Sequence, residues 1–211
     1  MKNLYIVGAG GCGREVLQII KDIHRIQGPR WDIMGFLDDT EDPLAGKDCD
    51  YGVVGTIVDY VPKENDVLAM AVADPKGKRK LAEMLLARGA TFENIIHPNA
   101  YLGEFNTIGI GNTIYGGFSI TSNSKIGNFT TLLCSLVGHD TQIGDYTTIS
   151  SLCNITGHVK IGEGVFIGGS CAIVPHAVIE DGAYVGMGSV VLRRVRAGKK
   201  VFGNPARVVD I

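Results

Sequence analysis

The chain has 211 residues, 45% of them hydrophobic, and a formal net charge of −2, so neither a nucleic acid nor an anionic membrane surface is expected as its main partner. No apolar run reaches the about 20 residues of a membrane span. Five cysteines without a C-x-x-C pair argue against a disulfide framework and favour the reducing cytoplasm.

Residues 1–92 alternate strand and helix signals. A short apolar run (residues 4–7) leads into the glycine-rich turn "GAGGCG" and then into an amphipathic helix. "DIMGFLDD" and "DVLAMAVAD" predict two further strands, and a second helix opens at Pro75 and stops at Gly89. This order predicts a small α/β domain, a Rossmann-like half with a parallel sheet.

In residues 93–211 an aliphatic residue recurs at every sixth position. Three hexapeptides of this kind close one triangular coil of a parallel β-helix, with the aliphatic residue pointing inward and glycine at the corners. We therefore predict a β-helix domain of about five to six coils with a C-terminal tail. The aliphatic positions are Ile96, Leu102, Ile108, Ile114, Ile120, Ile126 and Leu132, then, displaced by one residue, Val137, Ile143, Ile149, Ile155, Ile161, Ile167, Ile173, Ile179, Val185 and Val191.

Between Leu132 and Val137 the six-residue spacing of the aliphatic residues, the hexapeptide beat, shortens to five. We call this shortening the slip, and the motif "GHD" follows it directly. We interpret the slip as a tightened corner that turns His139 outward, above Gly157 of the next coil. An imidazole with a pKa of about 6.5 suits proton transfer near neutral pH, and Asp140 could orient it if the corner leaves strand geometry. The alternatives are a solvated surface histidine and an unrelated solvated acid.

Other histidines and cysteines of the repeats carry weaker signals. His158 and His176, one coil apart, could be metal ligands, but no carboxylate or cysteine recurs at matching positions, so we expect surface residues and no bound metal. Cys153 and Cys171 take the small inward position and are predicted to pack in the core. Cys134, beside the slip, could be a nucleophile, but the sequence places no base for it.

The glycine-rich turn fits G-x-G-x-x-G, and Asp38 and Asp39 follow it by about 25 residues. Taken alone, this pattern indicates a dinucleotide site. Because the domain supplies only one mononucleotide-binding half, we expect instead that the bare amides of Gly10 and Gly11 at the helix N-terminus hold a phosphate. A tight turn without a ligand is the alternative.

Four stretches, "YIVGAGGCGREV", "GFLDD", "GHD" and "GNPARVV", together resemble one family over nearly the whole chain. It is the sugar O-/N-acyltransferase family that includes the sialic acid O-acetyltransferases and the bacillosamine-pathway N-acetyltransferase. The resemblance implies a left-handed β-helix and an acetyl-CoA-dependent transferase that acetylates an amine or hydroxyl of a UDP-amino-sugar or a sialic-acid-type sugar for bacterial surface glycans. It also implies a cytoplasmic homotrimer with CoA in the groove between adjacent β-helices.

The same resemblance implies roles for single residues. His139 matches the general base, and Asp140 matches the acid that assists it. Relatives often have histidine in place of Cys12, and one has histidine in place of Thr148 and glycine in place of Met187. CoA would contact Thr148, Gly168, Gly169 and Met187, and the nucleotide sugar would rest on Gly10, Gly11, Cys12, Asp38, Asp39 and Ala73.

The C-terminal stretch "LRRVRAGKKVFGNPAR" is rich in cations. Such a run is usually a solvated end, but Arg207 and its neighbours could also bind the phosphates of CoA.

Two other classes of function, and a metal-dependent variant of the hexapeptide enzyme, stay open at this point. An NAD(P)-binding oxidoreductase would use the glycine-rich turn and would be stabilised by NAD but not by CoA. A non-catalytic binding protein would use the β-helix as a platform and consume no thioester. A metal-dependent hexapeptide enzyme would contain zinc.

Overall fold

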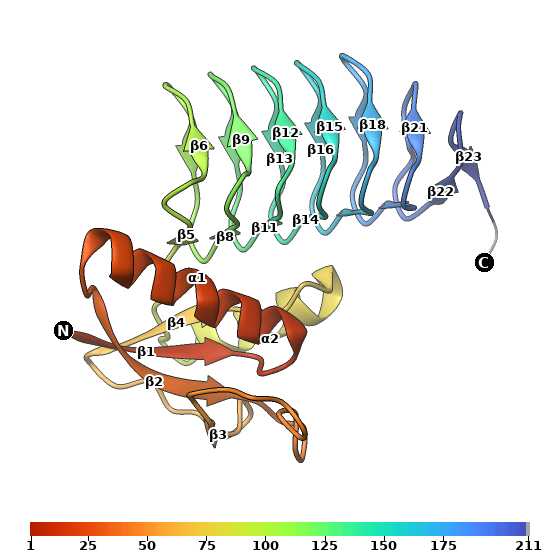
Figure 1. The fold of residues 1–211 in the computed structure, drawn as a ribbon. Helices are drawn as coiled ribbons and strands as arrows, with labels where there is room; N and C mark the ends of the chain where they lie inside the picture. The colour runs from red at the N-terminus through yellow and green to blue at the C-terminus, as the bar shows by residue number, and fades with distance from the viewer. Residues whose placement is uncertain (210–211) are drawn as a thin grey trace.

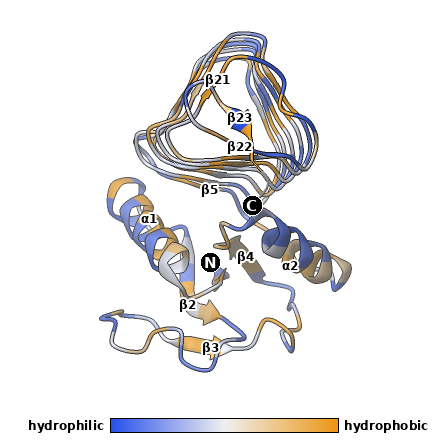
Figure 2. Ribbon diagram, turned by 90° about the vertical axis from the view of Figure 1, so that its right-hand side faces the viewer, coloured by the Kyte–Doolittle hydropathy of each residue, from blue (hydrophilic) through white to orange (hydrophobic). Residues whose placement is uncertain are grey.

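The computed structural model describes residues 1–209, in which an α/β unit lies beside a triangular β-solenoid (Figures 1 and 2). The α/β unit is a four-stranded parallel sheet of order β3-β2-β1-β4 with two helices. Its elements are β1 (Lys2–Val7), α1 (Gly11–Gln27), β2 (Trp31–Leu37), β3 (Val53–Gly55), β4 (Asp66–Met70) and α2 (Pro75–Ala87).

The two helices cover opposite faces of this sheet. Alternate residues of β1 point to opposite sides, so Leu4 and Ile6 pack with the apolar side of α1, and Val7 packs with that of α2. A side chain at Gly13 would overlap the carbonyl oxygen of Gly8, and this glycine therefore lets α1 start directly against the sheet. Asp74 caps α2 by accepting a hydrogen bond from the Gly77 amide.

The solenoid has three flat faces, each a stack of short strands that run parallel except for β23, and Figure 2 shows its triangular section end-on. The eight-stranded face contains β5 (Ile95–Ile96), β8 (Thr113–Ile114), β11 (Thr131–Leu132), β14 (Thr148–Ile149), β17 (Phe166–Ile167), β20 (Tyr184–Val185), β22 (Lys200–Phe202) and β23 (Arg207–Val208). The six-stranded face contains β6 (Tyr101–Leu102), β9 (Ser119–Ile120), β12 (Leu136–Val137), β15 (Asn154–Ile155), β18 (Ala172–Ile173) and β21 (Val190–Val191). The five-stranded face contains β7 (Thr107–Ile108), β10 (Lys125–Ile126), β13 (Gln142–Ile143), β16 (Lys160–Ile161) and β19 (Val178–Ile179).

The hexapeptide beat predicts this part of the fold correctly. From β5 to β21 the second residue of each strand is the predicted aliphatic one, and those from Ile114 to Val191 form one buried core. Cys153 and Cys171 lie in the same core, as predicted, and are 2% and 1% exposed. The first residue of each strand points outward, so three stripes of outward side chains determine what the three faces can contact.

The sequence predicts that His139 points outward and that the slip causes this. The first part is confirmed, since 56% of the His139 side chain is exposed, but the second is wrong. The missing residue belongs to the corner between β11 and β12, which has three residues (133–135) where the coils on either side have four. The corner of His139 (138–141) follows β12 and has the regular four residues. The strands around the slip stay in register, with Leu136 paired to Ser119 and Asn154.

The six-stranded face is bordered by two edges, each a column of corners. We call the edge between the six-stranded and five-stranded faces the histidine edge; its successive corners include 138–141, 156–159 and 174–177. We call the edge between the eight-stranded and six-stranded faces the groove edge; its corners include 133–135, 150–153, 168–171 and 186–189. The shortened corner therefore lies on the groove edge, and the two edges flank the six-stranded face.

The eight-stranded face packs against the α/β unit. The Thr113 hydroxyl donates a hydrogen bond to the carbonyl of Met70, and the rings of Phe92 and Phe129 meet edge to face at 4.9 Å. Phe129 belongs to the apolar cluster of α2, so the two units share a core. Neither helix within residues 1–209 is long and apolar enough to cross a bilayer.

Lys78 of α2 is the charged group at the centre of this contact. It is 0% exposed, and its Nζ donates to the hydroxyls of Thr131 (2.7 Å) and Thr148 (2.9 Å) and to the carbonyl of Thr147 (3.4 Å). The Thr148 hydroxyl in turn donates to the carbonyl of Ala73 at 2.6 Å. Burial away from water disfavours the charged amine and lowers the pKa of Lys78 to about 7.

We expect this lysine to make the stability of the protein depend on pH. Between about pH 7 and about pH 10.5 the unfolded chain carries a charged Lys78 and the folded protein a neutral one, so the unfolded state binds more protons. The stability contributed by Lys78 should then rise with pH, by at most ~1.4 kcal/mol per pH unit. When thermal unfolding is measured from pH 7 to pH 9.5, the stability of the wild type should rise relative to that of Lys78→Met. Lys76→Met, on the exposed side of α2, is the control. A constant difference between wild type and Lys78→Met would contradict this account.

Candidate active site

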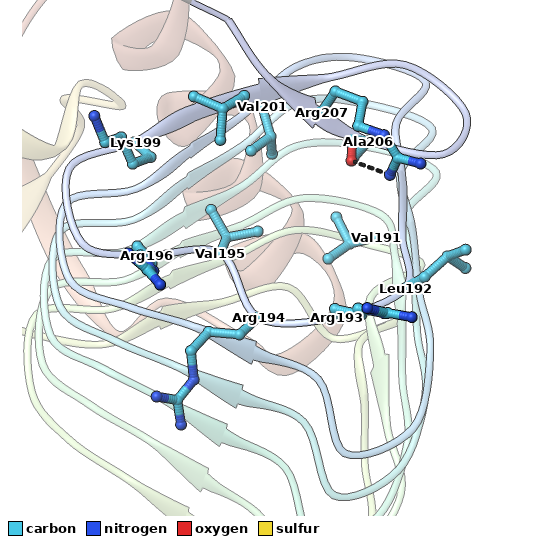
Figure 3. A pocket seen from close by; sticks show the side chains of 11 residues that line it. Val191, Leu192, Arg193, Arg194, Val195, Arg196, Lys199, Val201, Ala206 and Arg207 are labelled. Carbon is cyan, nitrogen blue, oxygen red and sulfur yellow. Dashed lines mark hydrogen bonds between the residues drawn. The ribbon is translucent and has the colours of Figure 1, made fainter.

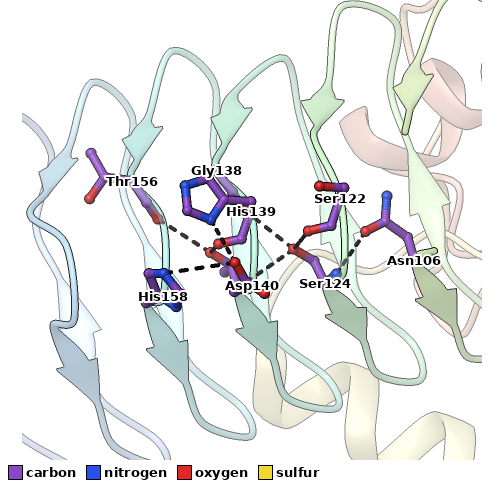
Figure 4. A network of polar contacts seen from close by, with 9 residues as sticks. Asn106, Ser122, Ser124, Gly138, His139, Asp140, Thr156 and His158 are labelled. Carbon is purple, nitrogen blue, oxygen red and sulfur yellow. Dashed lines mark hydrogen bonds and ion pairs between the residues drawn. The ribbon is translucent and has the colours of Figure 1, made fainter. Parts of the chain in front are cut away.

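The histidine edge brings His139 and Asp140 into direct contact (Figure 4). Consecutive residues of a strand point to opposite faces, but Asp140 has a φ of 56° at the corner, which curls its carboxylate back toward the preceding ring. Nδ1 of His139 and Oδ2 of Asp140 are 2.6 Å apart. A carboxylate can only accept a hydrogen bond, so Nδ1 donates, and Nε2 is left with a lone pair.

The His139 ring lies over Gly157 of the next coil. A Cβ atom at Gly157 would be 2.8 Å from Cε1 and 2.9 Å from Nε2 of the ring. Any other residue at this position would therefore push the imidazole away from Asp140. Both side chains of the pair are open to solvent, with 56% of the His139 side chain and 41% of the Asp140 side chain exposed.

A second column of side chains stands beside this pair. Nε2 of His158 lies 3.7 Å from the same Asp140 oxygen, and the His139 and His158 rings meet at right angles with centroids 5.0 Å apart. The His176 ring stacks on that of His158 at 4.8 Å. From the sequence we expect no carboxylate at positions that match these histidines, and this is wrong, because Asp140 occupies the equivalent left-handed position one coil before His158.

Two buried hydroxyl residues that no sequence motif singles out, Ser124 and Thr141, hold this corner. The Ser124 hydroxyl accepts from the Thr141 amide at 3.0 Å and lies 3.4 Å from the carbonyl of Gly138 (Figure 4). The Asp140 amide donates to the carbonyl of Ser122 at 3.0 Å. In the sequence Ser124 is one of many small polar residues at corners, so only the stacking of coils reveals its role.

The groove edge brings three of the predicted CoA residues together. Gly168, Gly169 and Met187 line a groove of about 320 Å³, and Met187 is 76% exposed. The remaining lining residues are Leu133, Ser150, Ser151, Phe166 and Tyr184. The rings of Phe166 and Tyr184 stack at 5.0 Å and form a flat apolar wall on the eight-stranded face.

The structure places the other two predicted CoA residues elsewhere. Thr148 is buried against Lys78 and Ala73, and its hydroxyl is used in that contact. Arg207 lines a separate cavity of about 620 Å³ at the end of the solenoid (Figure 3). This cavity has an apolar floor that includes Val191 and Val201, and the cations around it are Arg193, Arg194, Arg196, Lys199 and Arg207.

The glycine-rich turn is open to solvent, but its two acids are partly used within the fold. Gly10 and Gly11 are exposed, with free space where a side chain would be. The Asp38 carboxylate accepts hydrogen bonds from the amides of Ala9 (2.6 Å) and Thr40 (2.8 Å). Burial raises the pKa of Asp38, but these hydrogen bonds lower it by more, so the pKa lies below its usual value. Asp39 accepts from the amides of Ile57 and Val58, so each carboxylate also holds a loop.

Tyr115 of the solenoid reaches this turn, which the sequence does not predict. Its hydroxyl lies 3.6 Å from Sγ of Cys12 and donates to Glu15 Oε2 at 3.0 Å. Burial raises the pKa of Cys12, so its thiol stays protonated at neutral pH. The carbonyl of Ala73 accepts from Thr148. Of the predicted sugar residues, Cys12 and Ala73 thus contact the solenoid, whereas His139 lies at the edge opposite the eight-stranded face.

Comparison with known proteins gives matches along most of the chain. Residues 3–85 match the family model of the PglD N-terminal domain, and residues 158–193 match that of the bacterial transferase hexapeptide with six repeats. The GDP-perosamine N-acetyltransferase of Escherichia coli O157:H7 is 36% identical over 167 residues, which cover 75% of this chain and 72% of that protein.

Solved structures resemble the chain over almost its whole length. The acetyltransferase domain of PglB from Neisseria gonorrhoeae FA1090 is 25% identical, with a TM-score of 0.89 over 99% of this chain and 100% of that one. It has also been solved in complex with acetyl coenzyme A. WeeI from Acinetobacter baumannii AYE is 28% identical, with a TM-score of 0.87 over 99% and 100% of the two chains.

The contact between His139 and Asp140 predicts the tautomer of the ring. The neutral imidazole should carry its proton on Nδ1, because Asp140 accepts there, and long-range ¹H–¹⁵N NMR of the ring nitrogens can observe this directly. Replacement Asp140→Ala should shift the ring toward the Nε2–H form, while the spectrum of His24, in the α/β unit, stays unchanged. An Nε2–H tautomer in the wild-type protein would disprove the contact.

Proposed function

The chain belongs to the hexapeptide-repeat sugar N-acetyltransferases that carry a PglD N-terminal domain, and from this premise we propose that it transfers the acetyl group of acetyl-CoA to the amine of a nucleotide-activated amino sugar. The observation that carries the proposal is the His139–Asp140 pair seated over Gly157, with Nε2 directed away from its carboxylate partner. Relatives named for N-acetyl transfer favour the amine over the hydroxyl.

His139 acts as the general base of this reaction. As the sugar nitrogen attacks the thioester carbonyl, Nε2 of His139 takes a proton from that nitrogen, the new C–N bond forms, and the C–S bond breaks. The proton then passes to the sulfur of the leaving CoA. Asp140 stabilises the imidazolium and holds the ring in the tautomer that leaves Nε2 unprotonated.

The two substrates bind different parts of the chain. Residues 1–92 form the nucleotide-sugar domain, where the amides of Gly10 and Gly11 at the start of α1 face a phosphate. Cys12, Asp38, Asp39 and the segment of Ala73 border the same region. Residues 93–211 form the acyl-transfer domain, and CoA lies along the groove edge.

An extended CoA molecule can span the levels of the groove edge from His139 to the end of the solenoid. His139 belongs to the coil of β11, β12 and β13, whereas Met187 belongs to the coil that starts with β20, three coils further along. Stacked strands are about 4.8 Å apart, so the two levels differ by about 14 Å. An extended CoA can place its thioester at the level of His139 and its phosphates near Arg207 at the end of the solenoid.

A homotrimer completes the site. The outward residues of the six-stranded face are uncharged: Tyr101, Ser119, Leu136, Asn154, Ala172 and Val190. The five-stranded face, in contrast, presents Lys125 and Lys160. Depletion of charge is typical of an interface core. When three such prisms pack with their six-stranded faces around a threefold axis, each histidine edge meets the groove edge of the next chain.

This arrangement supports acetyl transfer better than either rival. A dinucleotide would need a second mononucleotide-binding half, and the sheet has four strands with Asp38 bonded to the turn itself. A non-catalytic platform has no use for a histidine oriented by a carboxylate above a glycine. The cytoplasm, where acetyl-CoA and nucleotide sugars are available, is the compartment that this function implies.

Loss of the base should abolish transfer without unfolding the protein. We expect His139→Asn to lower the rate of thiol release from acetyl-CoA by about 10²–10⁴-fold, because the amine then loses its proton acceptor. The assay should use GDP-perosamine and a panel of UDP-amino-sugars as acceptors.

Two further variants test the same assignment, one as a control and one as a second loss of function. His176→Asn, two coils away on the same edge, should keep the wild-type rate, whereas Gly157→Ala should resemble His139→Asn because its methyl group displaces the ring. Near-normal transfer by folded, trimeric His139→Asn would refute the proposed role of His139.

A charge on the six-stranded face should separate the subunits. Leu136 is 59% exposed on β12, and Leu136→Glu would place three carboxylates together at the proposed threefold axis. We expect light scattering to show monomers and transfer activity to fall with trimer content. Gln142→Glu, at the equivalent outward position of β13 between Lys125 and Lys160, should leave the assembly intact. A Leu136→Glu protein that remains trimeric would place the interface elsewhere.

A further inference from the structure

The histidine edge holds three side chains that can ligate one metal ion. One ligand atom each from His139, Asp140 and His158 lies within 4.8 Å of the others. The Asp140 oxygen is the centre of the cluster, 2.6 Å from Nδ1 of His139 and 3.7 Å from Nε2 of His158 (Figure 4). All three side chains are exposed, so an ion can reach them from solvent.

The backbone fixes the positions from which these side chains extend. Asp140 and His158 occupy equivalent left-handed positions in successive coils, with φ values of 56° and 59°. The His158 amide donates to the carbonyl of His139 at 2.9 Å, which ties the two corners together. On its far side the His158 ring packs against His176, and this restricts its rotation. The three ligands are therefore held close together before an ion arrives.

The chemistry of the ligands selects the class of ion. Two imidazole nitrogens and one carboxylate oxygen form the type of set that binds Zn²⁺ and leaves a fourth position open. Magnesium demands six oxygen ligands at short distances, and two imidazoles are poor substitutes. A borderline divalent transition-metal ion is thus the best match.

We propose that His139, Asp140 and His158 bind such an ion, probed here with Zn²⁺, and that the ion inhibits the enzyme. The inhibitory part rests on the proposed function. A metal bound to Nδ1 of His139 and to Asp140 replaces the hydrogen bond between them, and the ring proton then sits on Nε2. Nε2 can therefore no longer accept the proton of the amine. The ion is an inhibitor in this scheme, and no step of acetyl transfer uses it.

Binding is tested first, without reference to activity. Calorimetric titration of Zn²⁺ into chelator-treated trimer should show one site per chain, and Mg²⁺ should give no heat of binding. All proteins should carry Cys134→Ser, which removes an exposed thiol that could bind zinc. His158→Asn should weaken the affinity at least about tenfold, as expected when a ligand is lost.

His176→Asn is the matched control. It removes the same kind of ring, one coil further along the same edge, and asparagine tolerates the left-handed backbone at both positions. Its affinity should fall much less than that of His158→Asn, because His176 packs against the His158 ring but is not a ligand. Absence of saturable Zn²⁺ binding, or equal weakening by both replacements, would overturn the proposal.

Inhibition is the second readout. Each protein is compared with its own zinc-free rate, so a change in basal rate does not enter. Zn²⁺ should inhibit wild type and His176→Asn reversibly, with recovery on addition of EDTA, and His158→Asn should need at least about tenfold more Zn²⁺. If no sugar is acetylated at all, the proposed function fails, while the calorimetry still decides the metal site. If zinc binds but does not inhibit, the inhibitory role is refuted.

Discussion

Each coil of the solenoid must turn three corners, and this constraint decides where chemistry can take place. Along the short strands, one residue points into the core and the next points out, so neighbours in sequence never meet. At a corner the backbone enters the left-handed region, and neighbours such as His139 and Asp140 come into contact. The candidate catalytic pair, the floor under it and the candidate CoA glycines are all corner residues.

The aliphatic beat predicts the solenoid almost residue by residue, because each inward position is set by a local repeat that does not depend on distant contacts. The same reasoning places Gly157 under His139, since one coil separates them. Thr148 shows where prediction from sequence stops. As the outward residue of its strand it should be exposed, but the α/β unit covers that face, and Lys78 and Ala73 take its hydroxyl. Such contacts depend on how two units dock, which no local pattern records.

The slip illustrates the same limit in another way. The sequence locates the missing residue between Leu132 and Val137 but does not show which edge of the solenoid that corner forms, and the conspicuous residue nearby, His139, favours the wrong assignment. In the structure the shortened corner belongs to the groove edge, on the other side of the six-stranded face. The tie from Asp38 to Ala9 is likewise invisible in a motif that treats the acid as free for a ligand. In both cases the sequence does not show which neighbours the fold brings to a residue.

Because the coils stack regularly, equivalent residues along the histidine edge lie at evenly spaced heights. Positions along it differ in height by one strand spacing, about 4.8 Å, and hardly at all in direction. Insertion of one whole coil ahead of β12 would therefore move His139 by a single step from the start of the solenoid while keeping its orientation and its contact with Asp140. Insertion of one hexapeptide would instead carry it to a different edge. The height of a corner side chain along the solenoid can thus change only in discrete steps, whereas its direction is fixed by the edge that carries it.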